Sequence, residues 1–261
     1  MPYAANAGVH IYYEVHGDGF PVLLHTGGGG DLDMWRQAGY VDGLSGYQVI
    51  LVDHRGHGRS DRPTEIAAHR IERYVGDVIA VMDAVQVARV AFWGYSDGTN
   101  VGYALAAQHP ERVATIIATG ASSSANWQQA RAQDAMEWRE VLKDGMEGLN
   151  KELEQSEGGA VPEWFRSQMA GTDREMFLLE IDGWSSWEGP WSVLPTIDVP
   201  TLLMAGEMED PNGNTLQAAH RLPHGKCVMF PGLGHVAAFV RSDIALPHAI
   251  NMLEQVTDTK R

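Results

Sequence analysis

The sequence alternates between short, almost continuously apolar runs and amphipathic helical patterns. Apolar runs of this kind are typical of parallel strands that are covered on both faces of a sheet. Such runs span 9–17, 20–26, 47–53, 89–94, 113–120, 200–206 and 226–232, and the helical patterns span 65–84, 97–108, 213–222 and 243–256. The run 9–17 alternates more than the others and is expected at an edge. The alternation predicts an α/β fold: a mostly parallel central sheet with helices on both faces.

The region 122–196 breaks this alternation. It is rich in Trp, Met, Glu and Gln, has a helical character and contains no convincing strand. We therefore expect 1–121 and 197–261 to form the α/β core and 122–196 to form an inserted helical cap over one edge of the sheet. The region holds six of the eight tryptophans of the chain, namely Trp127, Trp138, Trp164, Trp184, Trp187 and Trp191.

The large apolar side chains of the cap are expected mainly to form its own core. A few of them are expected to line a pocket suited to acyl or aryl groups, because Trp and Met offer large, adaptable apolar surfaces. The acids Glu137, Glu140 and Glu180 are expected on its solvated face.

Charge and cysteine content narrow the classes of partner. The chain has 261 residues and a formal net charge of −15, with no run of Lys or Arg, which argues against nucleic acid or an anionic membrane as partner. The single cysteine, Cys227, cannot form an intrachain disulfide and stands in an apolar run. No stretch reaches about 18 apolar residues, and residues 1–17 lack the pattern of a signal peptide. A cytoplasmic protein is expected.

The sequence "VAFWGYSDG" places Ser96 between Gly94 and Gly98, at the end of an apolar run and just before a small-residue helix. A strand, a G-x-S-x-G turn and a helix together form a nucleophile elbow, which lifts the serine hydroxyl above the sheet. The alternative is a simple strand–helix turn capped by Ser96 or Asp97. We favour the elbow because partners for the serine follow later in the chain.

A serine hydroxyl needs a base, and the base needs a carboxylate to orient it. "FPGLGHVAAF" supplies His235 in a glycine-rich loop after the last predicted strand. "LLMAGEMEDPNG" supplies acids at the end of the preceding one. We favour Asp210, because Pro211 and the Asn-Gly after it mark a turn that would hold it at the sheet edge. Glu209, one residue closer to the strand, is the alternative.

An oxyanion needs two backbone N–H donors. The residue after the nucleophile, Asp97, supplies one. "LLHTGGGGD" is the expected source of the other, and Gly27 is our choice, because glycine lets backbone approach a ligand closely. Phosphate binding by these glycines is disfavoured because no P-loop lysine follows. His54 and His57 have a metal-like spacing, but no third ligand is evident, so no metal site is predicted.

These motifs together resemble the α/β-hydrolase superfamily over nearly the whole chain. The resemblance is carried by "HTGGGG", "VDHRGHGRSDRP", "GYSDG", "MAGEMEDP" and "GLGHV", and the order Ser, acid, His is that of the family. The elbow is also similar to that of valacyclovir-hydrolase-like members. The sequence departs from the family in His-Thr-Gly at the oxyanion loop and in one extra residue before "DP". In such enzymes Asp53 and Arg55 hold loops near the site and have no catalytic role.

The resemblance implies a serine hydrolase that cleaves a carboxylic ester of a small or medium apolar or aryl molecule through an acyl-enzyme on Ser96. It implies no metal or organic cofactor, and a small-molecule ester as the partner. Lactonase, C–C bond hydrolase and perhydrolase activities on the same residues remain alternatives, as does a non-catalytic protein that binds a small ligand. Ser96 argues against the relatives that use an aspartate nucleophile, the haloalkane dehalogenases and epoxide hydrolases.

Overall fold

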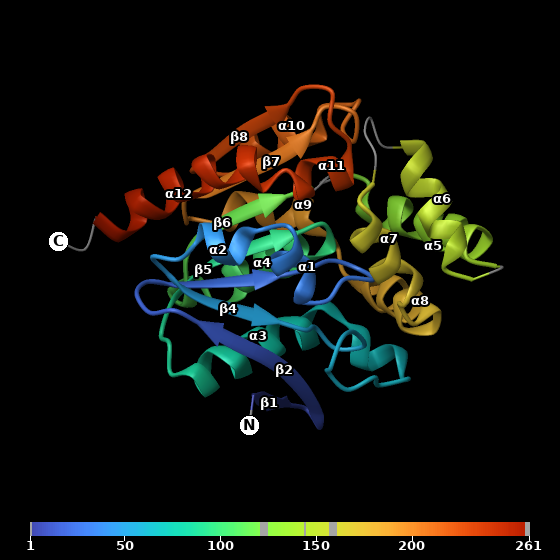
Figure 1. Ribbon diagram of the computed structural model, residues 1–261, viewed down its shortest axis with the longest axis horizontal. Helices are drawn as coiled ribbons and strands as arrows, with labels where there is room; N and C mark the ends of the chain where they lie inside the picture. Colours follow the sequence, from blue (N-terminus) through green and yellow to red (C-terminus); the bar gives the residue numbers. More distant parts are fainter. Residues whose placement is uncertain (1, 121–124, 144, 157–160, 259–261) are drawn as a thin grey trace.

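The computed structural model describes residues 2–120, 125–143, 145–156 and 161–258. Its described strands form one sheet in the order β1-β2-β4-β3-β5-β6-β7-β8 (Figure 1). β1 and β2 are antiparallel to their neighbours, and the other six strands run parallel. The strands are β1 (Tyr3–Asn6), β2 (Val9–His16), β3 (Pro21–His25), β4 (Gln48–Val52), β5 (Val90–Tyr95), β6 (Val113–Thr119), β7 (Thr201–Gly206) and β8 (Gly225–Phe230).

The predicted mostly parallel sheet is confirmed, with one addition. The sequence pattern missed β1, a four-residue strand that pairs with β2. β2 therefore lies second from the edge, whereas we expected it to form the edge itself. Four residues are too few for an alternating pattern to stand out from a turn.

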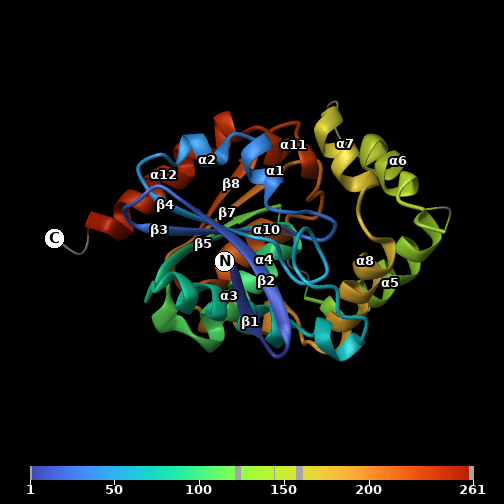
Figure 2. The ribbon, with the colours of Figure 1, turned by 60° about the horizontal axis from the view of Figure 1, so that its bottom comes forward.

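Helices cover both faces of the sheet, as predicted (Figure 2). One apolar core lies beneath α3, α4 and α10, and a second lies beneath α1, α2, α11 and α12 on the opposite face. The helices of the first face are α3 (Ile71–Val85), α4 (Asp97–Gln108) and α10 (Asn214–Arg221), with the short 3-10 helices η1 (Ile66–His69) and η2 (Pro110–Arg112). Those of the second face are α1 (Asp33–Gln37), α2 (Tyr40–Gly43), α11 (His235–Val240) and α12 (Ser242–Asp258).

A run of helices separates β6 from β7 along the chain and lies beyond the carboxyl ends of the parallel strands (Figure 1). We call residues 127–196 the helical insertion. Its described residues include no strand. The predicted boundary at residues 121 and 122 lies outside the described residues. The insertion comprises α5 (Trp127–Val141), α6 (Glu147–Ser156), α7 (Glu163–Ala170), α8 (Arg174–Gly183), η3 (Trp184–Ser186), α9 (Pro190–Val193) and η4 (Leu194–Thr196).

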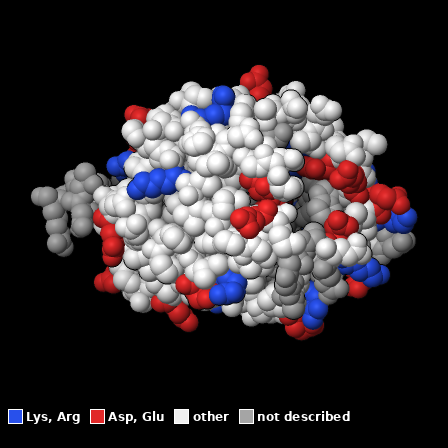
Figure 3. All heavy atoms as spheres, turned by 90° about the horizontal axis from the view of Figure 1, so that it is seen from above, with Lys and Arg blue, Asp and Glu red and all other residues white. Residues whose placement is uncertain are grey.

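On the face shown in Figure 3, acidic side chains are most frequent toward the insertion end of the molecule. Figure 3 shows Asp and Glu side chains gathered there, whereas Lys and Arg side chains lie singly over the same face. Cys227 is partly buried against the core on the α4 face. Among the described residues, every helix is too short or too polar to cross a lipid bilayer.

Candidate active site

Ser96 occupies a strained turn between β5 and α4. Its backbone has φ 55° and ψ −130°, a region that non-glycine residues rarely adopt. The flanking glycines make the turn possible: a Cβ on Gly94 would lie 2.5 Å from the nitrogen of Thr99, and one on Gly98 would lie 2.4 Å from the oxygen of His25. The structure therefore has the strand–turn–helix geometry of the predicted elbow. Strain maintained at one residue is typical of functional sites.

His235 lies directly against this turn. Its Nε2 is 3.1 Å from the Oγ of Ser96, within hydrogen-bond distance. Its ring stacks on Tyr95, with ring centroids 5.0 Å apart. Gly120 makes room for it, because a Cβ there would lie 2.8 Å from the Cε1 of His235. The imidazole thus lies between the ring of Tyr95 and the backbone of Gly120, and its Nε2 faces the serine.

The carboxylate that contacts His235 belongs to Glu209, which corrects our preference for Asp210. The Oε2 of Glu209 lies 2.6 Å from the Nδ1 of His235, and its Oε1 accepts a hydrogen bond from the backbone N–H of Gly206 at 2.7 Å. The side chain is only 9% exposed. Glu209 is therefore anchored to the end of β7 while it orients the imidazole.

Asp210 faces the other way. Its two carboxylate oxygens accept hydrogen bonds from the backbone N–H groups of Asn214 and Thr215, each at 2.7 Å. These groups belong to the first turn of α10, where the N–H groups have no partner within the helix. Asp210 therefore stabilises the start of α10, and both of its oxygens are already engaged there.

The backbone of Gly27 packs on the elbow. A Cβ on Gly27 would lie 2.6 Å from the Cβ of Ser96 and 2.8 Å from the nitrogen of Asp97. Further along the loop, the N–H groups of Gly29 and Gly30 donate to the Nε2 of His57 and to the oxygen of Gly27. The loop therefore brings Gly27 beside the N–H of Asp97, the two positions that the sequence indicated for oxyanion donors.

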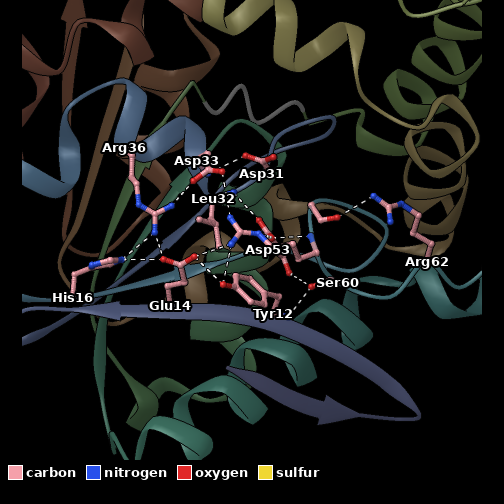
Figure 4. A network of polar contacts seen from close by, with 12 residues as sticks. Tyr12, Glu14, His16, Asp31, Leu32, Asp33, Arg36, Asp53, Ser60 and Arg62 are labelled. Atoms are coloured by element: carbon pink, nitrogen blue, oxygen red, sulfur yellow. Dashed lines mark hydrogen bonds and ion pairs between the residues drawn. The ribbon is translucent and has the colours of Figure 1, made fainter. Parts of the chain in front are cut away.

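The segment after β4 braces this loop, as the family resemblance implied. Asp53 accepts hydrogen bonds from the backbone N–H of Leu32 at 2.8 Å and of Arg59 at 2.9 Å, and Ser60 Oγ donates to its carbonyl oxygen (Figure 4). Burial raises the pKa of Asp53 to about 6. Arg55 instead forms a buried ion pair with Asp77 of α3.

Glu180, from α8 of the insertion, is buried beneath the glycine loop, which corrects its expected place on a solvated face. Its Oε2 lies 3.4 Å from His54 Nε2 and 3.9 Å from His57 Nε2. Among the described residues these three are the group that could hold a metal ion. However, His57 Nε2 already accepts the N–H of Gly29 at 3.1 Å, which leaves only His54 and Glu180 with free ligand atoms. Two ligands do not make a structural metal site.

The protonation states of Glu180, His54 and His57 explain how three titratable side chains pack together in the interior. Burial lowers the pKa of both His54 and His57 to about 3, so both rings are neutral at pH 7. Burial raises the pKa of Glu180 to about 7. Glu180 Oε2 and His54 Nε2 have no hydrogen-bond partner among the described residues, although they lie 3.4 Å apart, so neither group gains a hydrogen bond that would offset the burial of a charged carboxylate.

We predict that Glu180→Gln is more stable relative to wild type above neutral pH than it is at acidic pH. Because the folded-state pKa of Glu180 lies above its unfolded value, wild-type folding loses stability as pH rises from the unfolded pKa to about 7. The amide does not titrate, so the stability of the variant relative to wild type should rise between about pH 4 and pH 8. Thermal denaturation of both proteins at the two pH values measures this difference. Asp53 titrates in the same pH range, but it is present in both proteins, so its contribution cancels in the comparison.

Glu175→Gln is the matched control, since Glu175 is exposed on the same helix. It removes a carboxylate from the same helix without touching His54 or His57, so it should not reproduce the gain of Glu180→Gln at the higher pH. A Glu180→Gln variant whose advantage does not grow with pH would show that Glu180 is already ionised without penalty.

A cavity of about 370 Å³ opens over Ser96 and His235. The insertion supplies most of its apolar wall, as expected for some of its large side chains. Three charged residues, Asp97, Arg131 and Asp134, also line the cavity. The apolar lining includes Trp127, Trp138, Leu149, Phe165, Met169 and Phe177.

Comparison with known proteins is consistent with this geometry. The model of the alpha/beta hydrolase fold family matches residues 21–242, which is most of the chain. The chain belongs to the alpha/beta hydrolase fold family. A non-heme haloperoxidase of Rhodococcus erythropolis is 26% identical over 97% of this chain and 100% of that protein. The crystal structure of the enol-lactonase from Burkholderia xenovorans matches with a TM-score of 0.78 and 25% identity, over 97% of this chain and 100% of the other.

Shorter matches are higher in identity. A putative carbamate hydrolase of Azorhizobium caulinodans is 39% identical over 117 residues, which is 44% of this chain and 43% of that protein. The chain thus matches less than half the length of this relative. The named activities of these alpha/beta hydrolases differ, so the family membership defines the fold and the hydrolase class but not the bond that is cleaved.

Proposed function

We propose that this alpha/beta hydrolase is a serine hydrolase that cleaves a carboxylic ester through an acyl-enzyme on Ser96. The observation that carries the proposal is the continuous hydrogen-bond chain from Glu209 through His235 to Ser96, with distances of 2.6 and 3.1 Å. A nucleophile, a base and an orienting carboxylate in this relation are the parts that acyl transfer requires.

The proposed reaction has two halves. His235 Nε2 accepts the proton of the Ser96 hydroxyl as Oγ attacks the ester carbonyl carbon, and Glu209 stabilises the imidazolium. The backbone N–H groups of Asp97 and Gly27 hold the oxyanion, and His235 then protonates the departing alcohol. In the second half His235 takes a proton from water as the water oxygen attacks the acyl carbon, and it then returns this proton to Ser96 Oγ as the acyl C–O bond breaks, which releases the acid and free Ser96.

The cavity supports a small or medium apolar or aryl substrate. Its volume of about 370 Å³ is near the lower end of ligand pockets, and aromatic and aliphatic side chains of the insertion line much of it. A cyclic ester is the second candidate. The enol-lactonase structure covers this chain over nearly its whole length, and the same three residues would open a lactone by the same attack.

Labelling with a fluorophosphonate probe tests the proposal without knowledge of the substrate. The probe should attach to Ser96, identified by mass spectrometry of the peptide that carries it, and Ser96→Ala should remain unlabelled. The exposed Ser45, at the opposite end of the sheet, provides the control Ser45→Ala, which should label like wild type. Hydrolysis of p-nitrophenyl acetate and butyrate beside a γ-lactone then ranks open against cyclic esters. A wild-type protein that is not labelled would refute the proposed function.

A further inference from the structure

We propose that Arg131 of the helical insertion is a positioning residue that neutralises the carboxylate of Asp97 beside the reacting serine. This inference rests on the proposed function. Asp97 follows Ser96 directly and begins α4, its backbone nitrogen lies against Gly27, and its side chain carries a negative charge into the wall of the same cavity. A free carboxylate there would oppose the charge that develops on the oxyanion.

The contact between the two residues is direct and largely shielded from water. Arg131 Nη2 lies 3.1 Å from Asp97 Oδ2, and the two side chains are 7% and 21% exposed. The guanidinium also lies over two indole rings, 5.1 Å from the ring centroid of Trp127 and 5.4 Å from that of Trp184. Aromatic faces attract a cation and hold it in one place. The insertion thus provides a fitted site for this guanidinium.

No other described group takes over this role. Asn100 donates to Asp97 Oδ1 at 3.2 Å, but an amide carries no charge. A second acid also lies near the guanidinium, but its contact is longer: Asp134 is 3.8 Å from Nη1, and its side chain is 42% exposed. Within the described part of the chain, Arg131 is therefore the cation that pairs with Asp97.

The electrostatic consequence concerns the start of α4. A helix N-terminus carries a partial positive charge that favours an anion, which here would be the oxyanion. An unpaired Asp97 would compete for that charge at short range in a site of low dielectric constant, where such interactions are strong. Paired with Arg131, Asp97 leaves the N-terminus available. The insertion therefore shapes the electrostatics of the reaction as well as covering the site.

Four variants separate this role from a purely structural one. Arg131→Met, which keeps the bulk but not the charge, should lower kcat for p-nitrophenyl butyrate about 10- to 100-fold with little change in KM. Arg131→Lys keeps the charge and should recover most of the loss. The double variant Asp97→Asn/Arg131→Met removes both charges and should be at least about tenfold faster than Arg131→Met. The rate of fluorophosphonate labelling at Ser96 should follow the same order. If Arg131→Met does not fold, Arg131→Gln also removes the charge and should show the same loss of kcat.

Arg139→Met is the matched control. Arg139 lies on the same helix and pairs with Asp182 of α8, so its replacement removes an ion pair within the insertion without touching Asp97. It should change kcat by no more than about twofold. A double variant no faster than Arg131→Met would overturn the proposal, because relief by Asp97→Asn is what distinguishes charge from packing. A wild-type protein without labelling at Ser96 would instead reject the proposed function, and the role of Arg131 with it.

Discussion

Ser96→Ala and His235→Ala are each expected to lower kcat for an ester substrate by roughly four to six orders of magnitude. The physical reason is that the two side chains act as a unit: Oγ is a weak nucleophile unless Nε2, 3.1 Å away, accepts its proton. The double variant should therefore be no slower than either single variant. Steady-state hydrolysis of p-nitrophenyl butyrate, corrected for the uncatalysed rate, measures all three.

The comparison depends on folded variants. Ser96 lies in a strained turn whose geometry comes from its glycine neighbours, so loss of the hydroxyl should leave the melting temperature nearly unchanged. Ser45→Ala controls for loss of a serine elsewhere. Two single variants whose effects multiply in the double variant would mean that Ser96 and His235 act independently, which contradicts proton transfer between them.

The fold was predictable because most of its strands are buried on both faces and therefore appear as continuous apolar runs. β5, β6 and β7 are buried at every position, and each coincides with a predicted run to within a residue or two. β1 was missed because a short exterior strand needs no apolar run. Ser96 and His235 could be singled out because Gly94 and Gly98 flank the serine and Gly232 and Gly234 precede the histidine, in each case just after a strand.

Two residues owe their position to long-range packing: Glu180, which sequence reasoning misplaced, and Arg131, which it did not single out. Glu180 appeared to be an ordinary helix acid, yet α8 folds against η1 and buries it beside His54 and His57. Arg131 carried no local signal at all. Its role appears only when α5 brings it to Asp97, 34 residues away in the sequence. Such contacts between the insertion and the α/β core join residues at no fixed separation in the sequence, so a sequence pattern does not indicate them.

Glu209→Gln is expected to lower kcat by about 10³- to 10⁴-fold, whereas Asp210→Asn should change it by no more than a few-fold. In the structure Glu209 Oε2 lies 2.6 Å from His235 Nδ1, so the carboxylate fixes the tautomer in which Nε2 faces Ser96 and stabilises the imidazolium. An amide of the same shape provides neither the charge nor a reliable acceptor at that atom. Steady-state kinetics of both variants measure the contrast.

The two variants should also differ in folding stability, where Asp210→Asn is expected to have the larger effect. Asp210 accepts the N–H groups of Asn214 and Thr215, so Asp210→Asn should cost on the order of 1 kcal/mol of folding free energy, as loss of a charged cap does. A variant pair with the reverse pattern, an inactive Asp210→Asn and an active Glu209→Gln, would assign the carboxylate to Asp210. The extra residue before "DP" explains why adjacent acids diverge. Glu209 remains tied to the end of β7 through Gly206, whereas Asp210 is hydrogen-bonded to the first turn of α10.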